Sequence, residues 1–349
     1  MEHLDKKFFY DLSFEELETF FIQADLPKYR AKQVWLFVYK QGISDFNSMT
    51  NLPLSLRQLL SETFILERLK IEKLSTSEDK TKKILVRCLD GNTFEAVIIP
   101  EKDYFTVCVS SQIGCNMGCK FCCTGSQKMI RNISTGEIVM QFLLAKDLIQ
   151  DWKKDVKKLK NIVFMGMGEP LLNLDNVTNA IKILTSTDGL EISRHHITIS
   201  TCGIVPNIKK CAKELKVNLA LSLHAIDDES RSSLMPINKK FPLKEVLKAC
   251  REYSLLTKTK ITFEYILIDG VNDSEQDAKK LVSLISDINS KINLIPFNPW
   301  EGCSFMTSRE NRISKFSNVL KQKGYEILIR RSKGSDVDAA CGQLKMRNL

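Results

Sequence analysis

The sequence predicts an α/β fold: a partial (β/α)6 barrel, preceded by a small N-terminal helical domain and a short β-hairpin extension. From Tyr104 onward, short apolar stretches with strand character alternate with amphipathic stretches of helical spacing. Repeated βα units form a parallel sheet, and their common handedness curves it in one sense. About six units are fewer than the eight that close a barrel, so we expect an open one.

Residues 8–66 have a helical pattern. Ser13 and Glu16 form a capping box, in which the serine oxygen accepts the N3 amide and the glutamate accepts the N-cap amide. An apolar stripe at i, i+3 and i+4 follows, made by Leu17, Phe20 and Phe21. A second helix is expected over Tyr29–Lys40. We expect the aromatic side chains of this segment to pack in a core.

Two strands joined by a tight turn are expected next, Lys83–Leu89 and Thr93–Ile99. The Asp90-Gly91 pair between them is a hairpin signal. The chain is therefore divided into an N-terminal helical accessory domain at residues 1–75, a β extension or linker at residues 76–103, and the barrel at residues 104–349.

The barrel strands are short and rich in β-branched residues. They are expected at Phe105–Val109, Asn161–Met165, His196–Ser200, Asn218–His224, Ile261–Leu267, Ile292–Phe297 and Tyr325–Arg330. Helices are expected between them, at Thr135–Asp151, Asp175–Thr187, Pro206–Leu215, Leu243–Leu255, Ser274–Ile288 and Arg309–Lys323. An active site should lie at the carboxyl ends of the strands.

Composition narrows the class of protein. The chain has 349 residues, 43% hydrophobic and 27% charged, and no apolar run approaches the roughly 18 residues of a membrane span. Its start has no signal-peptide pattern, and eleven irregularly spaced cysteines do not suggest a disulfide framework, so we expect a cytoplasmic protein. The net charge of +9 is compatible with a polyanionic partner but does not require one.

Three cysteines in one short run carry the strongest chemical signal. Cys115, Cys119 and Cys122 have the spacing Cys-x3-Cys-x2-Cys, and the neighbouring Cys123 points elsewhere. Protein-held cubane clusters take four thiolates, so three leave one iron open to a small molecule. This spacing resembles that of radical S-adenosylmethionine (SAM) enzymes. The alternatives are buried thiols or a zinc site, although structural zinc needs four N or S ligands.

Small polar groups recur where later strands end. Together they would ring one mouth of the barrel, as a nucleoside-bearing cofactor requires. They are Gly166-Met-Gly168-Glu169-Pro170, Ser200-Thr-Cys-Gly203, Ser222-Leu223-His224 and Asn298-Pro299.

Three further residues stand apart from these motifs. Cys108 ends the first barrel strand, and Cys341 lies in a segment of small residues just after the last one. Both thiols should overhang the same rim. Glu95 shares a strand face with apolar residues and is either a proton acceptor or a solvated strand end.

At this point the residues resemble the RlmN family, dual-specificity RNA adenine-C2 methyltransferases of the radical SAM class. The resemblance runs almost end to end and is most specific at Asp338-Ala-Ala-Cys341-Gly-Gln-Leu344. The sister Cfr family, which methylates C8, typically lacks a proline at the position of Pro170 and has Arg-Tyr in place of Pro296-Phe297. Both differences favour C2 as the methylated carbon. Other matching segments are Cys108-Val-Ser-Ser-Gln-Ile-Gly-Cys115, Gly166-Met-Gly-Glu-Pro-Leu-Leu-Asn173, Met235-Pro-Ile-Asn-Lys-Lys240 and Ile292-Asn-Leu-Ile-Pro-Phe-Asn-Pro299.

The resemblance implies roles for individual residues. Cys115, Cys119 and Cys122 would hold a [4Fe-4S] cluster. Cys341 would carry a methyl group, Cys108 would resolve the enzyme–RNA adduct through a transient disulfide, and Glu95 would accept a proton. SAM contacts would come from Gly168, Glu169, Ser200, Ser222, Leu223, His224 and Asn298.

The resemblance also implies substrates and partners. These are an adenosine of 23S rRNA near the peptidyl-transferase centre and the adenosine 3′ of the anticodon in tRNA. An electron donor such as a flavodoxin or ferredoxin system is expected, with no membrane partner and a monomeric enzyme. Only five residues, Lys345–Leu349, follow the last motif, where some relatives have a longer basic tail.

Two other classes of protein remain open at this stage. Another radical SAM enzyme acting on a peptide or metabolite would share the cluster but would not need the Cys108 and Cys341 pair. A non-catalytic iron–sulfur or zinc module would bind RNA or carry electrons, but an electron carrier normally protects its cluster with a fourth thiolate.

Overall fold

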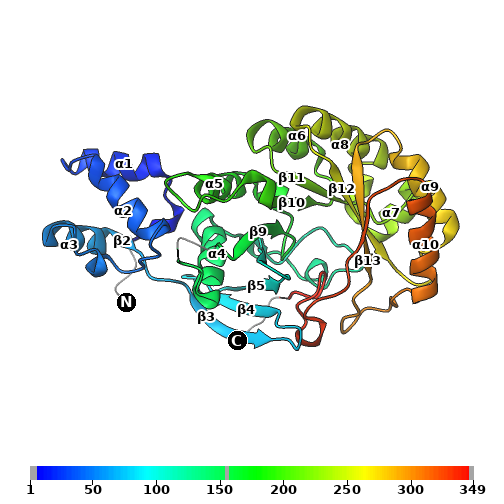
Figure 1. The fold of residues 1–349 in the computed structure, drawn as a ribbon, viewed down its shortest axis with the longest axis horizontal. Coiled ribbons are helices and arrows are strands. Elements are labelled where there is room, and N and C mark those ends of the chain that lie inside the picture. The colour runs from blue at the N-terminus through cyan, green and yellow to red at the C-terminus, as the bar shows by residue number, and fades with distance from the viewer. Residues whose placement is uncertain (1–5, 154–156, 346–349) are drawn as a thin grey trace.

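The computed structural model describes residues 6–153 and 157–345. The first five residues, where a signal peptide would begin, and most of the short basic tail lie outside these ranges. Within them, no helix is long and apolar enough to cross a membrane. The molecule is elongated, with the N-terminal helices at one end and the barrel helices at the other (Figure 1).

Seven parallel strands form the curved part of one sheet, which confirms the predicted partial barrel. The ten-stranded sheet has the order β14-β13-β12-β11-β10-β9-β6-β5-β4-β3, so each barrel strand pairs with the next one along the chain. A central strand such as β12 is buried along its whole length. The parallel strands are β6 (Phe105–Cys108), β9 (Leu159–Phe164), β10 (Ile197–Thr201), β11 (Asn218–Ser222), β12 (Ile261–Leu267), β13 (Ser290–Pro296) and β14 (Ile327–Ile329).

The predicted hairpin is part of the same sheet. β4 (Lys82–Arg87) and β5 (Thr93–Pro100) pair antiparallel, and β5 also pairs antiparallel with β6. A third strand, β3 (Lys70–Thr76), pairs with β4 and was not predicted. Its residues are exposed or half-buried throughout, so its sequence has no apolar alternation to reveal it.

Helices follow the barrel strands in turn, close to their predicted positions. They are α4 (Thr135–Ile149), α5 (Leu174–Thr185), α6 (Val205–Glu214), α8 (Leu243–Thr257), α9 (Glu275–Ile285) and α10 (Glu310–Gln322). Both halves of a capping box are present at the start of α4, between Ser134 and Glu137. A short helix, α7 (Asp228–Leu234), and a two-strand ladder of β7 (Gln112–Ile113) and β8 (Arg131–Asn132) were not predicted.

The N-terminal segment packs round its own aromatic core. It contains α1 (Phe14–Gln23), α2 (Tyr29–Tyr39) and α3 (Leu54–Thr63), and a short parallel pair, β1 (Lys7–Phe8) and β2 (Phe64–Ile65), joins its two ends. The capping box at Ser13 is present. The ring of Phe9 contacts four other rings, those of Tyr10, Trp35, Phe46 and Phe64. Most of the aromatic side chains therefore pack inside, as expected.

This aromatic segment meets the barrel at the start of α4. The Gly136 amide donates to Asp11 Oδ1 at 2.7 Å. A Cβ at Gly136 would lie 2.8 Å from the Asp11 amide nitrogen and 2.8 Å from the Phe8 ring. Farther along α4, Arg68 Nε lies 2.9 Å from Asp147 Oδ2. The missing side chain at Gly136 is thus what allows close contact between the two parts.

Replacing Gly136 by Ala should therefore destabilise the protein, although alanine is the better helix former by about 1 kcal/mol. We expect a net loss of about 1–3 kcal/mol of unfolding free energy, because the new methyl group overlaps backbone atoms. Urea unfolding measures this loss. Ser314→Ala, on the exposed face of α10, is the matched control and should leave stability unchanged or slightly higher. Equal stability of the two variants would show that the contact tolerates a methyl group.

Candidate active site

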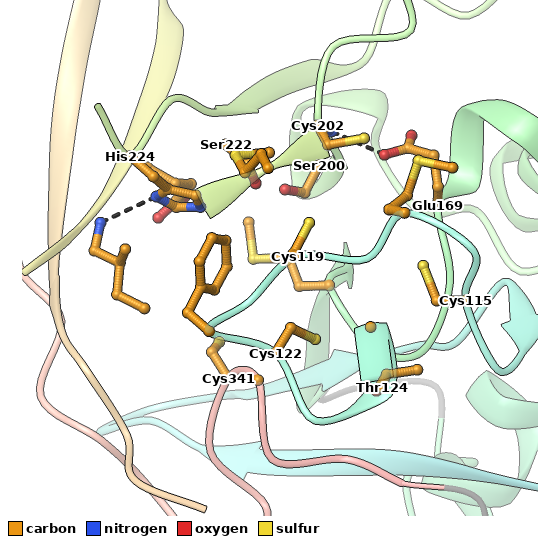
Figure 2. A pocket seen from close by; sticks show the side chains of 18 of the residues that line it. Cys115, Cys119, Cys122, Thr124, Glu169, Ser200, Cys202, Ser222, His224 and Cys341 are labelled. Atoms are coloured by element: carbon orange, nitrogen blue, oxygen red, sulfur yellow. Dashed lines mark hydrogen bonds between the residues drawn. The ribbon is translucent and has the colours of Figure 1, made fainter. Parts of the chain in front are cut away.

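A cavity lies at the carboxyl ends of the barrel strands, where the sequence predicted an active site (Figure 2). The three cysteines Cys115, Cys119 and Cys122 all line it, on the loop between β7 and β8. Cys341 reaches the same cavity from the C-terminal loop. Residues more than 200 positions apart in the sequence thus share one site.

The cysteine loop is held in its path by backbone contacts. Gly114 has φ +78°, and a Cβ there would lie 2.4 Å from the carbonyl oxygen of Lys128, in the part of the loop that precedes β8. Lys120 N donates to Leu234 O at 2.9 Å, which fixes the loop to α7. The glycine is required because other residues are strained at this φ and would overlap the neighbouring chain.

The three thiols fit a cluster better than a single metal ion. No three His, Cys, Asp or Glu side chains in the described part of the chain converge closely enough to hold one ion. The three cysteines instead line one cavity at separate points, as ligands to different corners of a cubane would (Figure 2). Burial raises the pKa of Cys115 to about 11 and also raises the pKa values of Cys119 and Cys122. Bound iron would deprotonate such thiols.

A fifth thiol borders the cavity, that of Cys202, which the sequence analysis named only as a member of the Ser200-Thr-Cys-Gly203 motif. Cys202 follows β10, and its amide donates to Glu169 Oε2 at 2.8 Å. Burial, followed by the charge of Glu169, raises the pKa of the Cys202 thiol. Cys202 lies far from the triad in sequence, so spacing could not indicate it. Cys123, which follows Cys122 in the sequence, is not among the described residues that line the cavity.

Glu169 is buried and bonded to the loops around it. Its Oε1 accepts from Leu171 N at 3.0 Å, while its amide donates to Gln112 Oε1 at 2.9 Å. Gly168 has φ +95°, and a Cβ there would lie 2.5 Å from Gln112 Cβ. Burial raises the pKa of the Glu169 carboxyl. The carboxylate therefore orders the strand ends and also borders the cavity.

Arg231 ties the ends of two strands together beneath the cavity. Its guanidinium donates to Cys202 O at 2.7 Å, Ser222 O at 3.0 Å and Leu223 O at 3.1 Å. The side chain is fully buried on α7. Ser200 and Ser222 border the cavity, whereas the Leu223 side chain is fully buried in the core. Arg231 was not identified from the sequence, where it is one of many basic residues.

His224 faces the cavity in a left-handed backbone conformation, with φ +59°. Its Nδ1 accepts from Ile266 N at 3.0 Å, so the proton of the neutral ring is on Nε2. Burial and the nearby charge of Arg231 lower the pKa of His224 to about 3. The edge of the Phe121 ring contacts this imidazole.

The loop that carries Cys341 is fixed on both sides. Asn298 Nδ2 donates to Cys341 O at 3.0 Å, and Cys123 N donates to Gly342 O at 2.7 Å. Thr124 Oγ1 donates to Leu344 O at 2.5 Å. Asn298 thus contacts the loop and, with Cys341, lines a second cavity inside the barrel.

Neither Cys108 nor Glu95 is among the described residues that line the first cavity. Cys108 lines the second cavity, which Cys341 also reaches, and burial raises the pKa of its thiol to about 12. Glu95 is 1% exposed. Its Oε1 lies 3.2 Å from Lys83 Nζ, and its Oε2 accepts from Lys345 N at 3.0 Å. The end of the C-terminal loop therefore covers this carboxylate.

Comparison with known families agrees with the two-part architecture. Residues 9–66 match the ribosomal RNA large subunit methyltransferase N-terminal domain, and residues 109–282 match the radical SAM superfamily.

Curated relatives cover nearly the whole chain. It is 47% identical to the dual-specificity RNA methyltransferase RlmN of Rhodospirillum rubrum, over 97% of this chain and 80% of the relative. It is also 47% identical to the RlmN of Geotalea uraniireducens, over 99% and 98%. The crystal structure of a radical SAM methyltransferase from Sphaerobacter thermophilus superposes with a TM-score of 0.92 at 40% identity, covering 97% of this chain and 99% of that one.

The lowered pKa of His224 predicts a pH dependence of stability. The unfolded imidazole binds a proton below about pH 6.5, whereas the folded one stays neutral to about pH 3. Stability should therefore fall as the pH decreases through this window, by up to about 1.4 kcal/mol per pH unit from this group.

His224→Asn removes the titration while keeping a residue that tolerates positive φ and can accept from the Ile266 amide. Urea unfolding at pH 7 and pH 5 should show a smaller loss for the variant, by about 2 kcal/mol. The same loss in both proteins would mean that His224 is protonated in the folded state.

Proposed function

This chain belongs to the RlmN family of dual-specificity RNA methyltransferases within the radical SAM superfamily, and we propose that it methylates C2 of adenosine in 23S rRNA and tRNA. The observation that carries the proposal is the position of Cys341. It shares a cavity with the three cysteines of the proposed cluster loop, although it lies more than 200 residues away in the sequence. A radical SAM enzyme that moves a methyl group through its own thiol needs these groups together.

In this proposal Cys115, Cys119 and Cys122 hold a [4Fe-4S] cluster, which, with SAM bound, supplies the electron for radical formation. SAM is held by Gly168, Glu169, Ser200, Ser222, His224, the main chain at Leu223, and Asn298. The neutral Nε2–H of His224 is a donor and the Glu169 carboxylate an acceptor, which suit a ligand that has both carboxylate and ammonium groups.

The thiol of Cys341 explains how an unreactive carbon can be methylated. Adenine C2 is electron-poor and has no lone pair, so it cannot displace the methyl group of a sulfonium, whereas a thiolate can. One hydrogen atom of the methyl group on Cys341 would pass to the radical that the cluster and SAM supply, and the remaining carbon would bond to C2, with the C2 proton lost to a base and one electron returned. Attack by the Cys108 thiolate on the Cys341 sulfur would then break the bond from that sulfur to carbon and form a Cys108–Cys341 disulfide, while the released carbon takes up a proton and becomes the methyl group of the RNA.

Glu95 is our candidate acceptor for the C2 proton. Because Lys345 N now bonds to its carboxylate, residues at the end of the C-terminal loop must move for RNA to reach it. We further propose that the enzyme is a cytoplasmic monomer, supplied with electrons by a flavodoxin or ferredoxin system. Residues 1–75 would form an accessory RNA-binding domain, residues 76–103 a linker and residues 104–349 the catalytic barrel.

Two variants test the proposed thiol chemistry. Cys341→Ala should abolish methyl transfer to RNA, because no methyl carrier remains. Cys108→Ala should leave RNA covalently attached to the protein, because the adduct cannot be resolved. A denaturing gel of the reaction with labelled RNA measures both effects. Cys303→Ala, a half-buried thiol outside the described linings of both cavities, is the control and should behave as the parent. Methyl transfer by the Cys341→Ala variant would refute the carrier step.

The substrate assignment is tested in the cell. Deleting the gene should remove 2-methyladenosine from 23S rRNA and from tRNA, as measured by mass spectrometry of nucleosides from each purified RNA. Restoring the intact gene should return both signals, and restoring the Cys341→Ala gene should return neither. An unchanged content of 2-methyladenosine would rule out the proposed reaction.

A further inference from the structure

A second cavity, of about 560 Å3, runs through the inside of the barrel. It opens among residues at the amino-terminal starts of the strands, opposite the end where the cysteine loop lies. Its lining there includes Thr106, Asn161, Thr198, Asn218, Thr262 and Lys291. We call this cavity the lumen.

The lumen adjoins the first cavity at Cys341, the proposed methyl carrier. Five residues line both cavities: Met165, Glu264, Ile295, Arg330 and Cys341. Cys108, in contrast, lines the lumen and is absent from the described lining of the first cavity. A molecule in the lumen would therefore meet the Cys108 sulfur, while the proposed cluster ligands and most of the proposed SAM contacts line the first cavity.

The lumen is polar where barrel interiors are usually filled by branched aliphatic side chains. Glu264 is 3% exposed, and its Oε1 accepts from Asn293 Nδ2 at 2.9 Å. Its Oε2 has no hydrogen-bond partner within the described part of the chain. A buried carboxylate oxygen of this kind needs water or a ligand to donate to it. The lumen is thus suited to small polar molecules.

Its charged lining favours anions. Lys291, Arg330, Arg331 and Lys333 line it, against two carboxylates, those of Glu101 and Glu264. Lys333 and Glu101 offset each other, with Nζ and Oε2 3.0 Å apart. Arg331 is likewise offset by Glu310, with Nη1 and Oε1 3.6 Å apart. Lys291 and Arg330 remain against Glu264, so the excess is positive, and charge inside a low-dielectric channel raises the local concentration of the opposite ion.

We propose that the lumen binds a small anionic thiol, which reduces the Cys108–Cys341 disulfide after each turnover. This inference rests on the proposed function, in which that disulfide forms. Cys108 is 5% exposed and lies within the barrel, so a small molecule in the lumen reaches its sulfur more readily than the active-site loop of a protein reductant, for which only the half-buried Cys341 is within reach.

The Cys108–Cys341 disulfide is reduced to two thiols, and two molecules of the small thiol are oxidised to one disulfide. A thiolate of the small molecule attacks the Cys108 sulfur, which forms a mixed disulfide and releases Cys341 as a thiolate. A second thiolate attacks the sulfur of the bound small molecule, which releases a small disulfide and the Cys108 thiolate, which then takes up a proton. The guanidinium of Arg330 favours the charged form of the Cys108 thiol and so assists Cys108 as a leaving group in the second step.

The test measures how fast thiols with the same two-carbon chain but different charge reduce the full-length protein after turnover. The probes are 2-mercaptoethanesulfonate, 2-mercaptoethanol and cysteamine, and maleimide-polymer labelling reports the free cysteines. After correction for thiolate fraction, the sulfonate should be fastest and cysteamine slowest, by roughly tenfold across the series. A rate independent of charge, or a faster reaction with thioredoxin than with the sulfonate, would overturn the proposal.

Two variants at residues that line the lumen test whether the small thiol reaches Cys108 through it. Lys291→Glu should slow the sulfonate and speed cysteamine, whereas Lys279→Glu, on the exposed face of α9, should change neither. Thr198→Trp should narrow the lumen and slow all three thiols. If Thr198→Trp does not fold, the charge reversal at Lys291 decides alone. Parental rates in Lys291→Glu would refute the lumen as the route.

Failure of the proposed function is a separate outcome. If turnover leaves Cys108 and Cys341 as free thiols, no disulfide forms and the resolving step is wrong. The lumen is then tested on a Cys108–Cys341 disulfide formed with diamide, and the same order of rates is expected from that protein. A different order there would contradict the lumen proposal itself.

Discussion

The site depends on contacts between the cysteine loop and the C-terminal loop. Cys123 N donates to Gly342 O, and Thr124 Oγ1 donates to Leu344 O. These bonds join segments about 220 residues apart and place Cys341 in the cavity of the three cysteines. Because both bonds use the main chain of the C-terminal loop, its side chains remain available for chemistry. The βα units of the barrel form the scaffold from which these two loops extend (Figure 1).

Much of the fold could be predicted from the sequence because its signals are local. The capping boxes at Ser13 and Ser134, the Asp90-Gly91 turn and the buried run of β12 each depend on a few adjacent residues. Strand β3 could not be predicted, because it lies at the sheet edge and buries little. Its place comes from pairing with β4, which is a tertiary contact.

The candidate site likewise contains residues that the sequence could indicate and residues that it could not. The cysteine triad has a diagnostic spacing, and the resemblance to a family pointed to Cys341, Cys108 and Glu95. Arg231 had no such signal, since it reaches the site through long-range bonds to other strand ends. Cys202 was named only as a member of the Ser200-Thr-Cys-Gly203 motif, and its bond to Glu169 required the structure. The polar lumen was also hidden, because it depends on which face of each strand points inward. The bond from Lys345 N to Glu95 likewise required the three-dimensional arrangement.

The central claim is that the transferred carbon passes through Cys341. The most direct measurement is mass spectrometry of the Cys341 peptide after anaerobic incubation of the Cys108→Ala variant with SAM labelled in its methyl group, followed by RNA. We predict a labelled carbon that links Cys341 to adenosine. Labelled RNA together with an unlabelled Cys341 peptide would contradict the account.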